Sequence, residues 1–398
     1  MRILLVHSHY GAAAPSGENR VFALERDMLI RNGHEVETYE RSSDALRANG
    51  TIGKLKGAAM TPWNLNAARD ISACVQRFRP EIVHAHNTFP MLSPAIFPAA
   101  RGAARVLTLH NYRLQCAAAI PMRDGGPCTD CIERQSAYPA LKHGCYRSSR
   151  AATAPLALSI ALHRARGTWQ RDIERFIALS GFQKELMARG GLPAEKIEVK
   201  PNFYPGQPKR IAFTDRPERI VFVGRISREK GVKDLVDAWR LWGPNAPELR
   251  IVGDGPLRAM LQQEATDLPQ VKFTGQLNSA TAEAEIASSR LLVVPSRWFE
   301  GFPMVLREAF AYGVATAVSG IGPLPTIVSN AKGVVFPAGA PEALSRCLQA
   351  LWQDQRKVED MAIASAEAFE TRYAESKNYD ELLAIYDRAI ASVAPSRN

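Results

Sequence analysis

The sequence predicts an α/β protein made of two consecutive domains, each with a parallel sheet covered by helices. Short apolar runs alternate with amphipathic ones along the chain, which is typical of repeated strand and helix units. The alternation restarts after residues 201–208, where three prolines and a glycine cannot continue a helix or a central strand. The length of 398 residues is sufficient for two or three domains with cores of their own.

The expected elements follow from this alternation. In the first half we expect a helix at 18–31 and strands at 2–6, 35–39, 81–85 and 105–109. In the second half we expect helices at 231–242 and 256–265 and strands at 219–223, 249–252, 271–274, 291–294 and 315–318. The predicted domains are residues 1–203 and 209–375, followed by a helical segment, 376–398, that packs back on the first domain.

The composition is that of a folded protein with one basic half. Apolar residues make up 46% and charged residues 23%, which excludes the composition of a disordered chain. The net charge is +10, and residues 1–200 contain 27 Lys and Arg against 17 Asp and Glu. Such a half attracts nucleic acid, an anionic membrane or a phosphorylated partner, or is simply a solvated basic surface. No aromatic residues alternate with the basic ones, so we expect no nucleic-acid binding.

We expect a cytoplasmic protein that does not cross a membrane. The first apolar run, Ile3–Val6, is far shorter than the core of a signal peptide. The longest apolar stretch, Ala151 to Leu162, is shorter than the roughly 20 residues that span a bilayer. Arginines flank this stretch, so it predicts either a buried helix or a peripheral contact with an anionic membrane.

Ligands of open α/β sheets bind beyond the carboxyl ends of the strands, which directs attention to the residues just after each predicted strand. In the first half these residues are the histidines His7, His9, His86 and His110. In the second half they are residues that expose the backbone, namely Gly224, Gly253, Gly275, Pro295 and Ser296. The first set favours proton handling and the second favours phosphate binding.

The segment 295–309 carries the strongest local pattern. Pro303 suits the first position of a helix and Gly313 suits its end, so the free amides at the helix start offer an anion site. Glu300 precedes this helix and Glu308 lies five residues into it, so we expect the carboxylates roughly 10 Å apart. That separation suits two ends of one extended ligand. The alternative is a pair of surface glutamates around an ordinary capped helix.

A second pattern follows the predicted strand 219–223. Arg225 and Lys230 stand there as two spaced cations that can neutralise a diphosphate without a metal ion, although a solvated loop is the alternative. Neither a dinucleotide fingerprint nor a P-loop occurs anywhere in the sequence, which argues against a nicotinamide enzyme or a P-loop kinase.

These motifs, in their order along the chain, resemble the retaining glycosyltransferases of family 4. The resemblance covers nearly the whole chain and rests on the Gly17 loop, the runs at 82–86 and 107–111, Lys200-Pro201-Asn202, the runs at 224–231 and 253–255, and Glu300 with Glu308. It implies the GT-B architecture, in which two Rossmann-like domains face a cleft.

The resemblance also implies a role for each motif residue. Arg225 and Lys230 would hold the donor diphosphate, Glu308 the nucleotide ribose, and Gly17 would approach the phosphates from the other domain. His110 would lie beside the donor sugar and the acceptor, with His110, Glu300, Arg225 and Lys230 forming the catalytic set. The donor sugar would be held by Glu300 with the backbone of Gly301, Phe302, Pro303 and Met304.

The expected activity is the transfer of a hexose from a nucleoside-diphosphate sugar to a saccharide or lipid-linked acceptor, with retention, during surface polysaccharide assembly. No Asp-x-Asp occurs in the sequence, so we expect catalysis without a divalent ion or other cofactor. The alternatives are a catalytically idle nucleotide-sugar-binding scaffold of the same fold and a nucleotide-sugar epimerase.

Four cysteines between positions 116 and 145 form a separate pattern. Cys116, Cys128, Cys131 and Cys145 include one Cys-x2-Cys pair, which is a common chelating half-site. Four thiolates complete a tetrahedral site, so the spacing predicts a structural zinc ion. Free cysteines in an acceptor loop are the alternative.

Overall fold

The computed structural model describes residues 1–9, 16–44 and 48–393. It divides into two compact units. The first unit contains Met1–Pro121, Thr129–Pro201 and Tyr379–Asn398, and the second contains Met122–Cys128 and Asn202–Asn378. The first unit is therefore discontinuous along the chain, and the end of the predicted segment 376–398, residues 394–398, lies outside the described residues.

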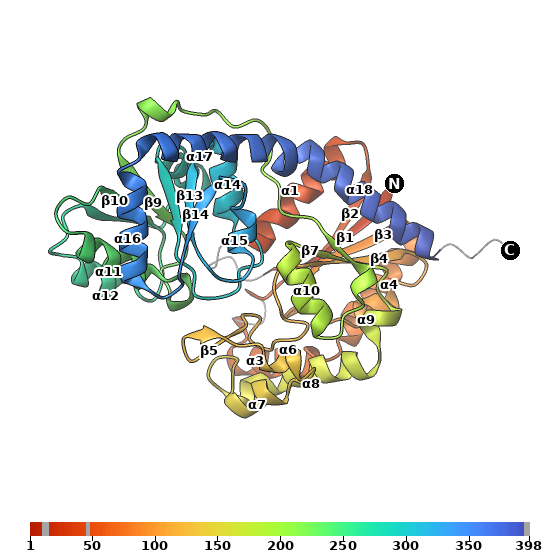
Figure 1. Ribbon diagram of the computed structural model, residues 1–398. Helices are drawn as coiled ribbons and strands as arrows, with labels where there is room; N and C mark the ends of the chain where they lie inside the picture. Colours follow the sequence, from red (N-terminus) through yellow and green to blue (C-terminus); the bar gives the residue numbers. More distant parts are fainter. Residues whose placement is uncertain (10–15, 45–47, 394–398) are drawn as a thin grey trace. The chain divides into compact units, whose positions relative to one another are not determined.

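A six-stranded parallel sheet forms the centre of the first unit, with strand order β2-β1-β3-β4-β7-β8 (Figure 1). Its strands are β1 (Arg2–His9), β2 (Glu35–Ser42), β3 (Ile82–Asn87), β4 (Ala104–Leu109), β7 (Arg175–Ala178) and β8 (Ile197–Val199). Every residue of β3 and β4 is buried, because a parallel sheet with helices on both faces buries its central strands completely.

Helices complete the first unit. They are α1 (Gly17–Arg31), α3 (Gly50–Met60), α4 (Leu65–Phe78), α5 (Ile96–Ala99), α6 (Asp130–Glu133), α7 (Tyr138–His143), α8 (Arg150–Ala165), α9 (Thr168–Arg171), α10 (Gly181–Arg189), the 3-10 turn η1 (Ala194–Lys196) and, from Tyr379 on, α18 (Glu375–Val393). The side chain of Ser149 caps α8 at the amide of Ala152, and the helix continues through Pro155. Its buried residues include Leu156, Ala157 and Ile160. The sequence predicted either a buried helix or a membrane contact for Ala151–Leu162, and the buried face of α8 agrees with the buried helix.

The second unit is built around another six-stranded parallel sheet, with strand order β11-β10-β9-β12-β13-β14. Its strands are β9 (Arg219–Val223), β10 (Glu248–Val252), β11 (Val271–Gly275), β12 (Leu291–Val294), β13 (Ala315–Ser319) and β14 (Gly333–Phe336), and a short hairpin, β5 (Met122–Arg123) and β6 (Gly126–Pro127), is grouped with the unit. This is the doubly wound order of dinucleotide-binding folds. The fold class predicted from the sequence is confirmed for both sheets.

The helices of the second unit pack on both faces of its sheet. They are α11 (Val232–Trp242), α12 (Arg258–Glu264), α13 (Ser279–Ala287), α14 (Met304–Tyr312), α15 (Leu324–Ile327), α16 (Pro341–Trp352) and α17 (Gln355–Ala368), with the short turns η2 (Phe213–Asp215), η3 (Arg228–Lys230) and η4 (Phe369–Tyr373). Their core joins Trp239, Leu235 and Leu348 to the strand residues Ile220 and Val293. Trp239 is fully buried, and its Nε1–H donates to the carbonyl oxygen of Pro247 at 2.9 Å.

Candidate active site

In the second unit the candidate site lies at the topological switch point of the sheet, between β9 and β12. The loops after these two strands pack directly on each other. Gly231 has a φ of +68°, and a Cβ there would lie 1.9 Å from the carbonyl oxygen of Pro295. The amide of Arg297 donates to the carbonyl oxygen of Glu229 at 2.8 Å. Only glycine permits this close approach of the two loops.

The two loops bring Lys230 and Glu300 together. Lys230 Nζ lies 2.7 Å from Glu300 Oε1, and the same oxygen accepts from Ser296 Oγ at 2.6 Å and from Trp298 Nε1 at 3.0 Å. The Glu300 side chain is buried, whereas Lys230 is partly exposed. The ammonium also lies 5.5 Å from the centre of the Trp298 ring. These contacts hold the Glu300 carboxylate in place and position the ammonium of Lys230, its ion-pair partner, at the surface of the site.

Helix α14 begins beside this pair. Pro303 is its N-cap and Met304 its first residue, so the expectation that Pro303 occupies the first helical position was off by one residue. No side chain caps this end, and Gly313 closes the other end in the left-handed conformation, as predicted. Glu308 is buried in the second turn, 3.8 Å from the buried guanidinium of Arg307.

The histidines predicted at strand ends gather in the first unit, around its own switch point between β1 and β3. His7 and His9 lie within β1 and His86 within β3, rather than after these strands, because both strands run further than predicted. His110 follows β4 directly. Strands β1 and β3 extend beyond the predicted ends because their last residues still pair with neighbouring strands. His9 of β1 pairs with Ser42 of β2, and Asn87 of β3 pairs with His7 of β1.

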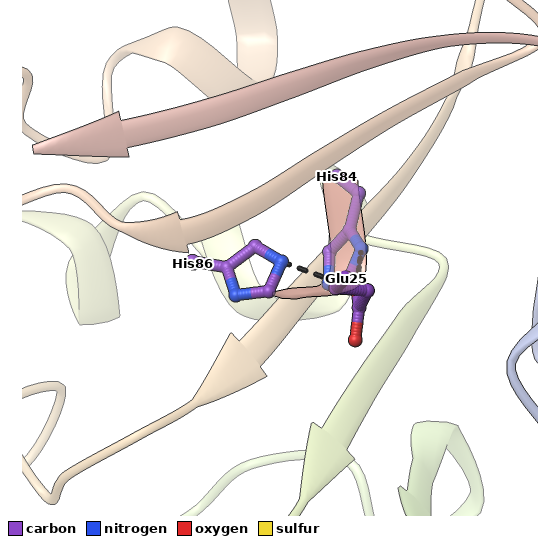
Figure 2. A group of neighbouring side chains, drawn as sticks. All are labelled: Glu25, His84 and His86. Carbon is purple, nitrogen blue, oxygen red and sulfur yellow. Dashed lines mark hydrogen bonds and ion pairs between the residues drawn. The ribbon is translucent and has the colours of Figure 1, made fainter. Parts of the chain in front are cut away.

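A buried glutamate on α1 connects these histidines. Glu25 Oε1 lies 3.1 Å from His84 Nδ1 and 3.2 Å from His86 Nε2, and Figure 2 shows both rings directed at this carboxylate. Its other oxygen lies 3.0 Å from Lys200 Nζ. His86 Nδ1 lies in turn 3.0 Å from His110 Nε2. We call Glu25, His84, His86, His110 and Lys200 the buried histidine network.

The charges of the network follow from its burial. Burial alone raises the pKa of Glu25, but the ammonium of Lys200 and the two nearby histidines outweigh it, so this pKa lies well below its usual range. Burial lowers the pKa of His84 to about 4 and that of His110 well below its ordinary value. The network therefore holds a Glu25–Lys200 ion pair, and the imidazoles of His84 and His110 are neutral at neutral pH.

Glu25, His84 and His86 are also residues that bind metal ions, and their ligand atoms lie within 4.8 Å of one another. Lys200 already neutralises the carboxylate, and each of its oxygens has a partner within 3.2 Å. The group is therefore complete as a hydrogen-bonded network.

Glu18 is a second titratable group in this region, at the start of α1. Its Oε1 accepts from Asn111 Nδ2 at 2.7 Å, while its Oε2 is buried without a partner among the described residues. Burial raises the pKa of this carboxyl to about 7, against the smaller opposing effects of Asn111 and Arg113. A carboxyl group that titrates near neutral pH in contact with Asn111, the residue after His110, is a candidate for proton handling.

A cavity of about 60 Å³ opens beside these residues, within the first unit. His86, His110, Asn111 and Arg113 form part of its wall. The other polar residues are Thr61, Asn87, Thr88, Ser93, Thr108 and Ser159, and the apolar ones are Phe89, Pro90, Pro94, Leu107, Leu109, Leu114, Leu156, Ile160 and Trp169. The guanidinium of Arg113 stacks 4.1 Å above the ring of Phe89. Apolar surface combined with convergent polar groups is typical of a small-molecule site.

The four cysteines carry free thiols. Cys116, Cys131 and Cys145 belong to the first unit and Cys128 to the second. The pKa of Cys116 is raised to about 12, mainly by burial and to a smaller extent by the neighbouring thiols of Cys131 and Cys145. In the part of the chain that the structure describes, the sulfur atoms of these three do not all lie within 4.8 Å of one another. The zinc site stays a prediction.

The structure thus brings Lys230, Glu300 and the start of α14 together in one unit, and His110 with the histidine strands in the other. Arg225 is exposed after β9, and Gly17 is the exposed first residue of α1. Sequence analysis missed Glu18 and Glu25 as functional candidates. Lys200 belongs to the Lys200-Pro201-Asn202 motif, but the sequence analysis assigned it no function. Nothing in the sequence near Glu25 indicates that its partner is this lysine, 175 positions away.

Comparison with known proteins identifies both halves. Residues 15–205 match the model of "Glycosyltransferase Family 4", and residues 205–368 match "Glycosyl transferases group 1". The amylovoran biosynthesis glycosyltransferase AmsK of Erwinia amylovora is 28% identical over 52% of this chain and 54% of its own length. The putative teichuronic acid biosynthesis glycosyltransferase TuaC of Bacillus subtilis is 22% identical over 75% of this chain and 68% of its own.

Solved structures show the same fold at low identity. The sucrose-phosphate synthase of Thermosynechococcus elongatus superposes with a TM-score of 0.70 at 16% identity, over 98% of this chain and 99% of its own. HepE of Anabaena, in complex with UDP and glucose, gives 0.66 at 15% identity, over 97% and 99%. The fold is GT-B. The chain therefore combines a domain of the Glycosyltransferase Family 4 type, residues 15–205, with a domain of the Glycosyl transferases group 1 type, residues 205–368.

Proposed function

We propose that this glycosyltransferase moves a hexose from a nucleoside-diphosphate sugar to a saccharide acceptor, free or lipid-linked, in the assembly of a surface polysaccharide. The observation that carries the proposal is the Lys230–Glu300 pair at the switch point of the second sheet. A cation and a fixed carboxylate at the start of α14 suit the two ends of a sugar diphosphate. The names of AmsK and TuaC support the polysaccharide context, and HepE with UDP and glucose supports the donor class.

In this proposal the donor is held by the residues of the second unit. Lys230, the exposed Arg225 and the uncapped amides of α14 would stabilise the negative charge that develops on the departing diphosphate. Glu308 would bind the ribose, and Glu300 the hexose together with the backbone of residues 301–304. Because these groups are cationic or dipolar before the reaction starts, the transfer would need no divalent ion.

The acceptor would bind in the first unit. The wall of the cavity next to His110 combines polar side chains, which suit the hydroxyls of a sugar, with apolar ones, which suit a less polar body that carries the sugar. Gly17 at the start of α1 would approach the donor phosphates. Retention of configuration belongs to the proposal because the motifs of this chain resemble those of retaining enzymes.

We also propose that contact with an anionic membrane involves α3. This helix buries Gly53 and Gly57 and leaves Ile52 and Leu55 exposed at 76% and 67%. Its lysines, Lys54 and Lys56, are exposed, and it carries no acidic residue. Apolar and basic side chains on the same exposed helix fit the interface of an anionic bilayer. No helix among the described residues is long and apolar enough to span a bilayer.

The proposal is tested by a panel of UDP- and GDP-sugars in thermal shift, followed by transfer assays. A donor at about 100 times its dissociation constant adds about 2.7 kcal/mol to the stability of the protein that binds it. Transfer with retained configuration, read by NMR of the product, is the expected result. Binding without transfer to any saccharide would favour an idle scaffold. An altered sugar nucleotide formed without an acceptor would favour an epimerase.

A further inference from the structure

The buried histidine network runs without a break from an ion pair in the interior of the first unit to the wall of its cavity. Lys200 pairs with Glu25 at 3.0 Å, Glu25 contacts His86 at 3.2 Å, and His86 contacts His110 at 3.0 Å. Glu25, His86 and Lys200 are almost fully buried, whereas His110 is partly exposed and lines the cavity. Because each group in this series of hydrogen bonds must donate to or accept from the next, the position of the proton on His110 can be deduced from the charge of Glu25.

The first step concerns Glu25. Its carboxylate is ionised at neutral pH because the Lys200 ammonium lies against it. An ionised carboxylate only accepts hydrogen bonds. His86 must therefore donate to Glu25 from Nε2–H.

The second step concerns the two imidazoles. In its neutral form an imidazole carries one proton, so the neutral form of His86 with Nε2–H has an unprotonated Nδ1. That Nδ1 accepts, which requires His110 to donate from Nε2–H. Neutral His110 is then left with an unprotonated Nδ1, the one acceptor of its ring.

We propose that Glu25 and His86 are positioning residues that hold His110 in the Nε2–H tautomer, so that His110 offers a hydrogen-bond acceptor to a substrate hydroxyl. The inference rests on the proposed function only for the identity of that substrate, a sugar. It predicts that His110 binds a hydroxyl that donates to it and selects against a sugar in which that hydroxyl is replaced by hydrogen, because the acceptor on His110 would lose its partner.

The network also provides a matched control. His84 lies on the same strand as His86, is equally buried and contacts the same carboxylate at 3.1 Å. Its other hydrogen-bond partners are the hydroxyls of Tyr386 and Thr108, at 2.8 and 2.7 Å, whereas the hydrogen bond to His110 comes from His86. If the buried imidazoles have only a structural role, substitutions at His84 and His86 should have equal effects. The relay, by which we mean the hydrogen bonds from Glu25 through His86 to His110, predicts that only a substitution at His86 changes the tautomer of His110.

The test is ¹⁵N NMR of the histidine ring nitrogens in the full chain labelled with ¹⁵N-histidine, with His110→Gln used to assign the signals. We expect the Nε2–H tautomer for His110 in the wild type and in His84→Gln, and a mixture of tautomers in His86→Gln. The kcat/KM on the identified donor should fall on the order of 10- to 10²-fold for His86→Gln, because the substrate hydroxyl would lose its correctly oriented acceptor. An Nδ1–H tautomer in the wild type, or equal effects at both positions, would overturn the inference.

Two further comparisons separate the possible failures. Should His86→Gln not fold, the double variant Glu25→Leu, Lys200→Met removes both members of the ion pair together, leaves no unpaired buried charge and takes away the acceptor of His86. The relay again requires a mixed tautomer of His110 in that variant, and an unchanged single tautomer contradicts it. The NMR measurement needs no substrate, so absence of transferase activity refutes the proposed function and leaves the tautomer result valid.

Discussion

Replacing Glu18 by glutamine should change how the stability of the protein depends on pH. Its folded pKa of about 7 is raised from 4.5, mainly by burial. The folded state therefore binds a proton more tightly than the unfolded state, and the contribution of this group to stability is full below pH 4.5 and is lost as the pH rises through 7. The shift corresponds to about 3 kcal/mol in total, of which about 2.5 kcal/mol falls between pH 5 and pH 8.

The assay is urea unfolding of the wild type and Glu18→Gln in parallel at pH 5 and pH 8. Glutamine is neutral at both pH values, so the variant should gain about 2 to 3 kcal/mol relative to the wild type on going from pH 5 to pH 8. Buried histidines such as His84 change the stability of both proteins equally and cancel in the difference. The exposed Glu35→Gln serves as a control for the loss of one surface charge. A difference between wild type and Glu18→Gln that stays constant with pH would refute the reasoning.

The other predictions concern the donor, the metal and the membrane. Lys230→Ala should lower turnover on the order of 10² to 10³-fold, while the control Lys233→Ala, at an exposed neighbouring lysine, should stay near wild type. Brief EDTA treatment should have no effect on the wild type. If EDTA abolishes activity, manganese restores it and Lys230→Ala is nearly silent, transfer without a metal ion is contradicted. Elemental analysis should find about one zinc per chain, reduced in Cys131→Ser, and metal-free protein prepared without chelator would count against the site. Vesicles with anionic lipid should bind the wild type more than Ile52→Glu, and this binding should fade with salt; equal binding to neutral vesicles would disprove the electrostatic part.

The strands and the site of the second unit were predicted more completely than those of the first, because the sequence patterns that define them involve residues close together in the chain. Strands β9 and β12 begin and end where the apolar runs do, and Gly313 ends α14 through its own backbone preference. The Lys230–Glu300 contact follows from two motifs at adjacent strand ends. Such features depend on a few neighbouring residues and on a known strand order.

The buried histidine network could not be predicted in this way. Glu25 lies on an amphipathic helix, where a glutamate normally faces solvent, and it is buried because Lys200, far along the chain, supplies the opposite charge. The raised pKa of Glu18 likewise depends on what covers its carboxylate, which no spacing reveals. Short edge strands such as β8 were also missed, since three residues give no measurable period.

The place of Tyr386 has a consequence for the order in which the protein forms during synthesis. The hydroxyl of this residue, on α18, reaches His84 in the centre of the first unit. Between Pro201 and Tyr379 the ribosome must add most of the second unit, which takes about 10 to 35 s at the usual rate of elongation. During that interval the first unit lacks its last helix, while the second unit gains its sheet in one continuous stretch. The half of the protein that is made first is therefore completed last.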